Sequence, residues 1–343
     1  MVMLTPALAA LHAWRSDLRL TVVSEPAFAP VLEGNAAVTE ILLHRSFFST
    51  AGALRQRHFP VLFNQHAGPT SALLTAMSGA PVRVCWAGRQ FAFAYNVQAP
   101  EPAAFFGPRP VHTVEHRMTQ FYWTGLPQGP IPPARVFPQP DAVASVATKL
   151  AARGIAGGQG YAVIHPGASD ARKRWSAERF GGVAQWLARE HGLRPVVRLG
   201  PGDAALARGV RESFGNDVVV FDGAAMNLRE TIALIADARL FLGNDSGPAH
   251  LAAGTGRRVV IIFGATDAQT WRPWQTPNRV VEATQPCPQC KTGRCYASAG
   301  SRCILSISGQ QVRDACEELL HASMTSTEDQ GNGKGKRENG LAQ

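Results

Sequence analysis

Residues 240–267 read LFLGNDSGPAHLAAGTGRRVVIIFGATD, two apolar runs separated by a polar turn and a short helical segment. The first run stops at Gly243, and small or polar residues fill the chain up to Pro248. Proline suits the first turn of a helix, because the N–H that it lacks would have no helical partner there. The stretch therefore predicts a buried strand, a tight turn, a helix and a second buried strand.

The rest of the second half repeats this alternation of apolar runs and amphipathic helices. Strands are expected at residues 161–165, 195–199, 218–221, 240–242 and 259–263. Ser176 can cap a helix that ends at Gly192, between the first two of these strands. Strands that alternate with helices indicate a parallel sheet covered on both faces. We therefore expect a Rossmann-like α/β domain of about five strands.

The first half follows the same plan less regularly. Helices are expected near residues 5–14, 70–79 and 111–127, and strands at 18–23, 40–43, 60–63 and 82–86. Residues 125–140 then hold six prolines in sixteen positions, which excludes a helix or a central strand and indicates an inter-domain linker. A chain of 343 residues also favours two domains over one.

The predicted organisation is α/β in both halves. It comprises a first Rossmann-like domain at residues 1–135, a linker and helix at 136–158, a second Rossmann-like domain at 159–323 that includes a cysteine-rich segment at 287–303, and a tail at 324–343. The tail has almost nothing to bury and is expected to be disordered.

The chain is basic, with a formal net charge of +9, which suits anionic partners such as phosphate-bearing molecules, nucleic acid or an anionic membrane surface. A nucleic-acid partner is disfavoured, because no basic helix with interleaved aromatic residues is present. No apolar run reaches the roughly 18 residues of a transmembrane helix. The first residues lack the basic start of a signal peptide, so a cytosolic reducing compartment is expected.

Glycine-rich, charged segments follow four of the predicted strands in the second half. They include HPGASDARKRW at residues 165–175, GPGDAAL at 200–206 and FGATD at 263–267. Each could be a simple turn, a solvated basic loop or a helix cap. Ligands of open parallel sheets, however, bind beyond the carboxyl ends of the strands, and a helix N-terminus there attracts phosphate. Four such ends in one sheet favour a nucleotide diphosphate site.

Two of these segments resemble a known family. GNDSGPAHLAAGTGRRVVIIFGATD and IHPGASDARKRWSAERF are similar to the hallmark motifs of the heptosyltransferases, glycosyltransferase family 9, and looser similarity extends over about residues 1–320. The resemblance implies a GT-B fold, in which two Rossmann-like domains face each other across a cleft. It also implies an inverting glycosyltransferase that moves a sugar, usually heptose from ADP-heptose, to a lipopolysaccharide-core or related acceptor.

The resemblance assigns a donor pocket to the second domain. Lys173 is expected to contact the diphosphate and Asp203 to lie near the ribose. The full set expected at the nucleotide-sugar pocket is Ser169, Lys173, Arg174, Asp203, Asp245, Ser246, Gly247 and His250. A lysine and helix N–H groups stabilise the charge that grows on a departing diphosphate, so no metal or cofactor is required for catalysis.

The first domain is expected to bind a lipid-linked acceptor through residues of about 44–60 and 88–110, where variable loops are predicted. The basic surface would then hold the protein against the anionic inner face of the cytoplasmic membrane, as a peripheral protein. The sugar, the acceptor and the oligomeric state do not follow from these residues.

The start of the chain departs from the family pattern. Members open with a strand and a Gly-Asp loop, whose Asp is the presumed base, and Met1 falls where that loop should end. A sheet without this strand would have a gap and an exposed edge. Either Met1 is internal to a longer reading frame whose upstream codons encode an apolar run and Gly-Asp, or the chain binds nucleotide-sugar without catalysis. The catalytic residue is unknown; Glu25, Glu33 and His66 are candidates by location only.

Four of the six cysteines form the cluster CPQCKTGRCYASAGSRC, namely Cys287, Cys290, Cys295 and Cys303. The two-residue spacing of the first pair is typical of zinc knuckles, whereas the later spacings of four and seven residues are less so. A structural zinc site and reduced thiols in a surface loop are both open. Cys85 and Cys316 are expected to be buried.

Overall fold

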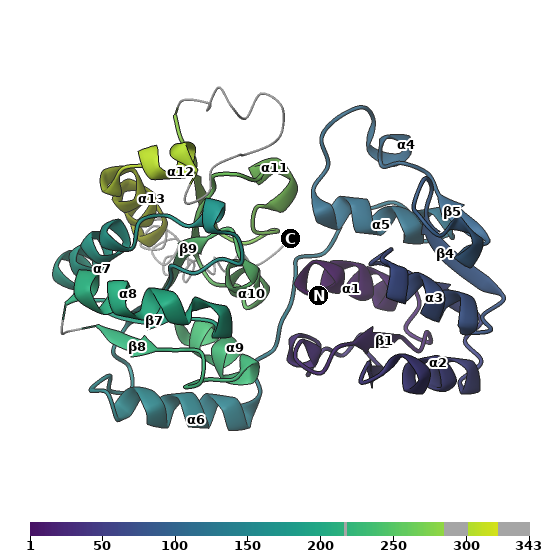
Figure 1. Ribbon diagram of the computed structural model, residues 1–343, viewed down its shortest axis with the longest axis horizontal. Helices are drawn as coiled ribbons and strands as arrows, with labels where there is room; N and C mark the ends of the chain where they lie inside the picture. Colours follow the sequence, from purple (N-terminus) through teal and green to yellow (C-terminus); the bar gives the residue numbers. More distant parts are fainter. Residues whose placement is uncertain (216–217, 285–300, 322–343) are drawn as a thin grey trace, which may run out of the picture.

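The computed structural model describes residues 1–215, 218–284 and 301–321, which form two α/β halves side by side (Figure 1). Each helix among the described residues is too short or too polar to span a bilayer. The second half contains one six-stranded parallel sheet in the order β11-β10-β9-β6-β7-β8. Its strands are β6 (Tyr161–His165), β7 (Arg194–Arg198), β8 (Val219–Phe221), β9 (Leu240–Asn244), β10 (Val259–Ile262) and β11 (Asn278–Val281).

The predicted parallel sheet is confirmed, with one strand more than expected. β11 reads NRVV and has no apolar run that would mark it as a strand. It forms because β10 offers a free edge, along which Val259 pairs with Asn278. The central strands β6, β9 and β10 are buried throughout, as expected of a parallel sheet covered on both faces.

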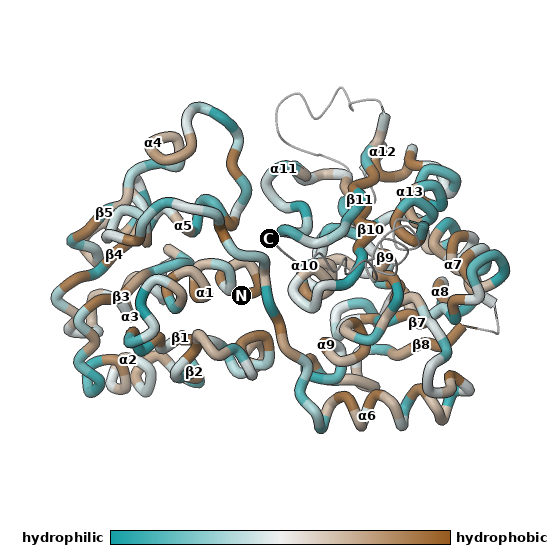
Figure 2. Tube along the Cα trace, turned by 180° about the vertical axis from the view of Figure 1, so that it is seen from behind, coloured by the Kyte–Doolittle hydropathy of each residue, from teal (hydrophilic) through white to brown (hydrophobic). Residues whose placement is uncertain are grey.

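Helices cover both faces of this sheet. They are α6 (Pro140–Ala151), α7 (Ala177–His191), α8 (Ala207–Phe214), α9 (Leu228–Asp237), α10 (Gly247–Gly254), α11 (Ala268–Trp271), α12 (Arg302–Ser306) and α13 (Gly309–His321), with 3₁₀ turns η4 (Ala171–Lys173) and η5 (Pro201–Leu206). As predicted, the Ser176 hydroxyl caps α7, accepting from the Arg179 N–H, and Gly192 ends it with a φ of 62°. Figure 2 shows polar and apolar residues alternating around α6, whose buried residues follow a four-residue spacing.

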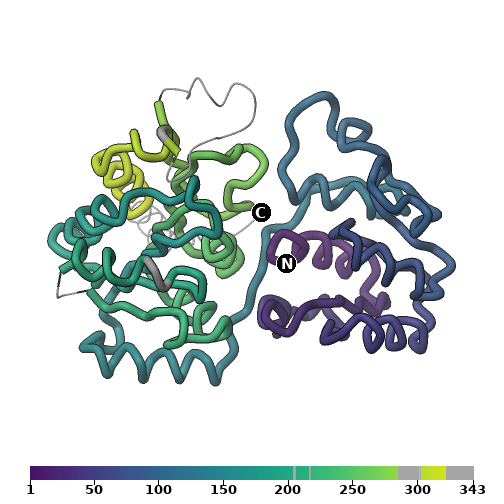
Figure 3. Tube along the Cα trace, viewed as in Figure 1, coloured from purple at the N-terminus to yellow at the C-terminus, as the bar shows by residue number. Residues whose placement is uncertain are grey.

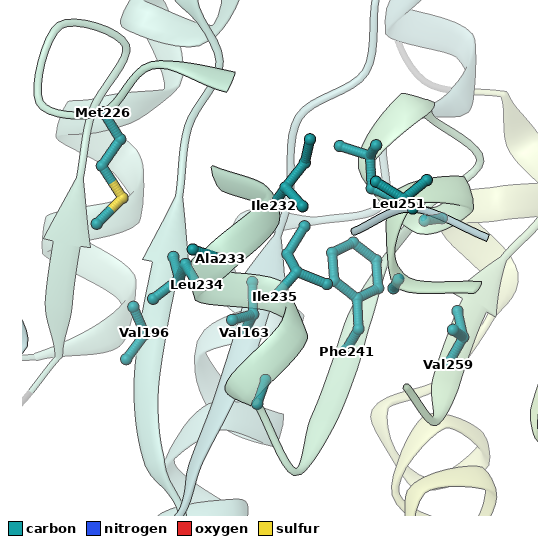
Figure 4. Close-up of a cluster of buried hydrophobic side chains, with 14 of the residues drawn as sticks. Val163, Val196, Met226, Ile232, Ala233, Leu234, Ile235, Phe241, Leu251 and Val259 are labelled. Atoms are coloured by element: carbon teal, nitrogen blue, oxygen red, sulfur yellow. The ribbon is translucent and has the colours of Figure 1, made fainter. Parts of the chain in front are cut away.

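Alternate residues along each strand enter two different cores, because successive strand side chains point to opposite faces. Val163, Phe241 and Val259 pack with the α9 side chains Ile232 and Ile235 in the first core (Figure 4). The second core holds the intervening strand residues, with side chains of α7, α8 and α13; its members include Ile164, Leu242, Phe180, Leu187 and Phe214.

The first half contains two separate parallel sheets. One pairs β1 (Thr21–Ser24) with β2 (Glu40–Leu43), and the other has the order β3 (Val61–Phe63), β4 (Val82–Trp86), β5 (Val97–Ala99). The helices are α1 (Thr5–Trp14), α2 (Phe47–Gln56), α3 (Pro69–Met77), α4 (Ala103–Phe106) and α5 (Thr113–Trp123), with 3₁₀ turns η1 (Val2–Leu4), η2 (Ala29–Val31) and η3 (Ala92–Ala94).

The expected gap in the first sheet is present. No described strand lies between β1 and β3, and each of these strands pairs on one side only. Their apolar side chains are accordingly exposed: Val23 on β1 is 36% exposed and Val61 on β3 is 39% exposed. Side chains of α1 and α5, such as Leu8 and Phe121, form a core beside this gap.

The variable loops predicted at 44–60 and 88–110 are wrong in part. The first contains α2, which Ser46 caps by accepting from the Ser49 N–H and which Ala51 and Leu54 anchor in the interior. The second contains η3, β5 and α4, three short elements that pattern analysis misses because none exceeds four residues.

The linker runs between the two halves (Figure 3), and its residues pack directly against the second half. The Val136 N–H donates to the Gly254 carbonyl at 2.8 Å, and a side chain on Gly254 would meet Val136 Cγ2 at 2.6 Å. Trp274 Nε1 donates to the carbonyl of Pro132 at 3.0 Å. Between the two halves, the Arg229 guanidinium donates two hydrogen bonds of 2.7 Å to the Glu33 carboxylate.

Candidate active site

The carboxyl ends of β6, β9 and β10 meet at one edge of the second sheet. His165 at the end of β6 is level with Gly243 on β9, and Ile262 at the end of β10 is level with Asn244. The loops that leave these strands carry the predicted donor residues. The sheet register therefore brings together segments that lie far apart in the sequence.

Lys173 and Asp245 form the charged centre of this edge. Lys173 Nζ donates to Asp245 Oδ2 at 2.7 Å, and the Thr266 hydroxyl donates to the same oxygen at 2.6 Å. The Asp245 side chain is only 5% exposed, whereas that of Lys173 is 24% exposed. The buried carboxylate thus holds a partly accessible ammonium at the mouth of the sheet.

The N-terminus of α10 adjoins this ion pair. Ser246 occupies the N-cap position, but its hydroxyl donates backwards to the Asn244 carbonyl at 3.1 Å and does not cap the helix. The backbone N–H groups of the first turn of α10 therefore receive no hydrogen bond from the Ser246 side chain. The side of Gly247 where a Cβ would point is open space, so an anion can approach the backbone there.

His250 lies one turn into α10, and its Nδ1 is buried without a hydrogen-bond partner among the described residues. Burial lowers the pKa of this imidazole to about 4, although the nearby Asp245 carboxylate acts in the opposite direction. The ring is therefore neutral near pH 7 and can donate or accept a single hydrogen bond to a bound group.

Arg174 and Asp203 lie beside the loop that follows β6 and carries Lys173. Asp203 Oδ2 accepts from the Gly200 N–H at 2.9 Å and lies 3.9 Å from His165 Nε2. A side chain on Gly167 would meet that oxygen at 2.0 Å, so the loop after β6 passes directly over the carboxylate. Arg174 donates to the Ala168 carbonyl of the same loop. Both residues brace the loop that carries Lys173.

Ser169 lies exposed on that loop. The candidate bases named by location lie in other settings. Glu33 is paired with Arg229, Glu25 is exposed, and the His66 ring packs against the turn at Gly68.

Two residues of α5 and its cap were missed by sequence analysis. The His112 Nδ1 accepts from the Val114 N–H, which places the ring proton on Nε2, and this nitrogen lies 2.8 Å from the Arg272 carbonyl across the two halves. The ring also stacks on Trp274. Arg117 donates to the Gln65 carbonyl at 3.0 Å, and burial lowers the pKa of its guanidinium. The capping box from His112 to Glu115 marks the first residue; nothing in the pattern marks the second.

The predicted zinc ligands Cys287, Cys290 and Cys295 lie outside the described residues, so the zinc site stays a prediction. Cys303 is in α12, where its thiol contacts the Ser301 hydroxyl at 3.1 Å. The predicted tail at 324–343 likewise lies outside the described residues. Cys85 and Cys316 are buried, as expected.

The chain is similar to known proteins in sequence. The model of glycosyltransferase family 9 (heptosyltransferase) matches residues 47–299. Lipopolysaccharide heptosyltransferase 3 of Escherichia coli is 36% identical over 119 residues, 34% of this chain and 35% of that protein. Lipooligosaccharide heptosyltransferase 2 of Campylobacter jejuni is 27% identical over 164 residues, 47% and 51% of the two chains. The aligned part thus spans about a third to a half of these relatives.

Solved structures share the fold. A family 9 glycosyltransferase from Veillonella parvula has a TM-score of 0.81 at 20% identity, covering 94% of each chain. The E. coli ADP-heptose lipopolysaccharide heptosyltransferase II has a TM-score of 0.74 at 18% identity, covering 94% of this chain and 96% of that one. E. coli heptosyltransferase WaaC, solved with ADP, has a TM-score of 0.66 at 19% identity, covering 94% and 95%. With its GT-B fold and family match, this chain belongs to glycosyltransferase family 9, the heptosyltransferases.

Proposed function

We propose that this protein transfers a heptose from an ADP-heptose donor to a lipopolysaccharide-core acceptor, with inversion at the anomeric carbon. The main support for a donor site is the Lys173–Asp245–Thr266 cluster. It lies beside the N-terminus of α10, where no side chain caps the helix. An ammonium and a helix N-terminus together suit a diphosphate. Structures of a related heptosyltransferase hold ADP and ADP-2-deoxy-2-fluoro heptose, which favours an adenosine diphosphate sugar here.

The chemistry follows from where charge develops. When the glycosidic bond to the diphosphate breaks, negative charge grows on the leaving oxygen, and Lys173 and the α10 backbone stabilise it. Asp245 and Thr266 hold the ammonium in place before the donor arrives, so little reorganisation accompanies the reaction. The neutral His250 ring can hydrogen-bond a phosphate or sugar oxygen. These groups supply the charge stabilisation without a metal cofactor.

The acceptor hydroxyl also needs a base, and we assign that role to no described residue. The alternative function is that of a protein that binds the nucleotide-sugar without transferring its sugar. The acceptor is expected to be lipid-linked, and the net charge of +9 would draw the protein to an anionic membrane face.

Calorimetric titration with ADP, UDP, GDP and CMP tests the donor site. We expect ADP alone to bind, and Lys173→Ala to weaken that binding at least about tenfold, the effect of losing one charge-assisted contact. Arg189→Ala removes a cation from α7 and serves as the matched control, expected to leave ADP binding unchanged.

Equal binding of ADP to Lys173→Ala and the unaltered protein would contradict the assignment of the diphosphate to this edge. A turnover assay with ADP-heptose and a lipopolysaccharide-core acceptor then separates transfer from donor binding alone.

A further inference from the structure

A polar pocket of about 350 Å³ lies along β8, the terminal strand of the six-stranded sheet. Three arginines line it, Arg153, Arg194 and Arg211, and we call it the arginine pocket. Figures 1 and 2 both show β8 beside α6, after whose end Arg153 follows. Arg194 opens β7, so the pocket reaches towards the amino ends of the strands, whereas the candidate donor site lies at their carboxyl ends.

The arginine pocket carries positive charge that the described residues do not neutralise. Asp222 is the one carboxylate among the described lining residues, and its Oδ2 lies 4.0 Å from an Arg211 nitrogen, with both side chains about half exposed. Neither Arg153 nor Arg194 has a carboxylate partner in the part of the chain that the structure describes. The lining thus combines three cations with one weakly paired anion.

Two of the guanidinium groups make contacts with the rest of the fold. The Arg153 guanidinium carbon lies 4.3 Å from the centre of the Phe221 ring, within the range of a cation–π interaction. The Arg194 Nε is buried and has no hydrogen-bond partner among the described residues. A buried donor without an acceptor costs free energy, so an anion that reaches it gains more than at an ordinary exposed arginine.

We propose that the arginine pocket binds a phosphoryl group, carried by a soluble phosphate ester or by a phospholipid headgroup. The planar guanidinium fork matches the oxygens of phosphate better than a lysine ammonium does. β8 adds backbone donors, because the outer edge of a terminal strand lacks a strand partner. The proposal does not depend on the donor site, which uses other strands and other residues.

The test uses the full chain and two probes, inorganic phosphate by calorimetry and vesicles of phosphatidylcholine with or without phosphatidic acid by co-sedimentation. The main variant is Arg153→Gln/Arg211→Gln, since both side chains are exposed and their loss leaves the core intact. Arg208→Gln on α8 is the matched control, also exposed and outside the pocket lining. All proteins carry Lys173→Ala, so that phosphate binding at the donor site is weakened to the same extent in each of them.

We expect the double variant to bind inorganic phosphate about tenfold more weakly than the Arg208→Gln control does. A parallel loss of binding to phosphatidic-acid vesicles would identify a headgroup as the source, and loss of free phosphate alone would identify a soluble ester. The proposal is overturned if the unaltered pocket binds neither probe, or if Arg208→Gln weakens binding as much as the double variant.

Discussion

The two halves of this molecule are both built from parallel strands and helices, but their strand side chains are buried to different degrees. In the second half, β6 lies between β7 and β9, and the sheet continues through six parallel strands. In the first half, the position between β1 and β3 is unfilled by any described strand, and the sheet divides into two strands and three. Some apolar side chains of the strands beside the gap, such as Val23 and Val61, are therefore more exposed than those of the central strands β6 and β9.

The difference extends to the candidate active site. Lys173, Asp245 and Thr266 meet because β6, β9 and β10 are adjacent and in register. The first half offers Arg117, a cation enclosed by protein that donates to a backbone carbonyl rather than to a carboxylate. The second half thus presents a paired charge cluster, whereas Arg117 in the first half has no acidic partner among the described residues.

The largest expected contrast comes from one substitution made in each sheet. Val163 on β6 is fully buried and Val23 on β1 is 36% exposed. Val163→Ala is expected to lower the free energy of unfolding by about 2–3 kcal/mol, since two buried methyl groups and their packing are lost. Val23→Ala is expected to cost under about 1 kcal/mol. Hydrogen exchange with peptide-level resolution reports each half separately.

Equal losses at the two valines would show that the gap beside β1 is closed in solution. We also expect the amides of β1 and β3 to exchange faster than those of β6 while both variants are folded. The reason is that β1 and β3 each have one edge without a strand partner.

A smaller contrast concerns helical glycines. A side chain on Gly181 in α7 would meet the Ser213 carbonyl oxygen of α8 at 2.3 Å, whereas nothing lies within 4 Å of the corresponding position on Gly52 in α2. Gly181→Ala is expected to cost about 1–3 kcal/mol, because backbone must move apart. Gly52→Ala is expected to stabilise by about 0.5–1 kcal/mol through better helix propensity.

Thermal unfolding of the two glycine variants gives the comparison directly. A stable Gly181→Ala protein would mean that α7 and α8 can separate at little cost. The contact between α7 and α8 would then be no more tightly packed than the surroundings of α2 in the first half.

Sequence patterns predict most of the second half because its signals are local. The apolar runs of β6, β9 and β10 and the Ser176 cap each follow from a few neighbouring residues. The bond from Thr266 to Asp245 and the bond from His112 to Arg272 join residues 21 and 160 positions apart, and no local pattern contains them. β11 was missed for the same reason, since only the free edge of β10 makes NRVV a strand.

A pH dependence is expected at His250, beside the junction of the two halves. The unfolded chain protonates this histidine below about pH 6.5, whereas the folded chain does so only near pH 4. The free energy of unfolding should therefore fall as pH is lowered from about 6.5 to about 4, by at most about 1.4 kcal/mol per pH unit. Denaturant unfolding at successive pH values measures this slope.

His250→Asn should flatten that slope, because asparagine has no group that titrates in this range. His321→Asn on α13 is the control, since the His321 side chain is 62% exposed, and it should leave the slope unchanged. An unaltered slope in His250→Asn would show that the ring is solvated in the folded protein. Solvent would then reach the carboxyl edge of the six-stranded sheet, as it reaches the strands beside the gap in the first half. The two halves would therefore not differ in burial at the candidate active site.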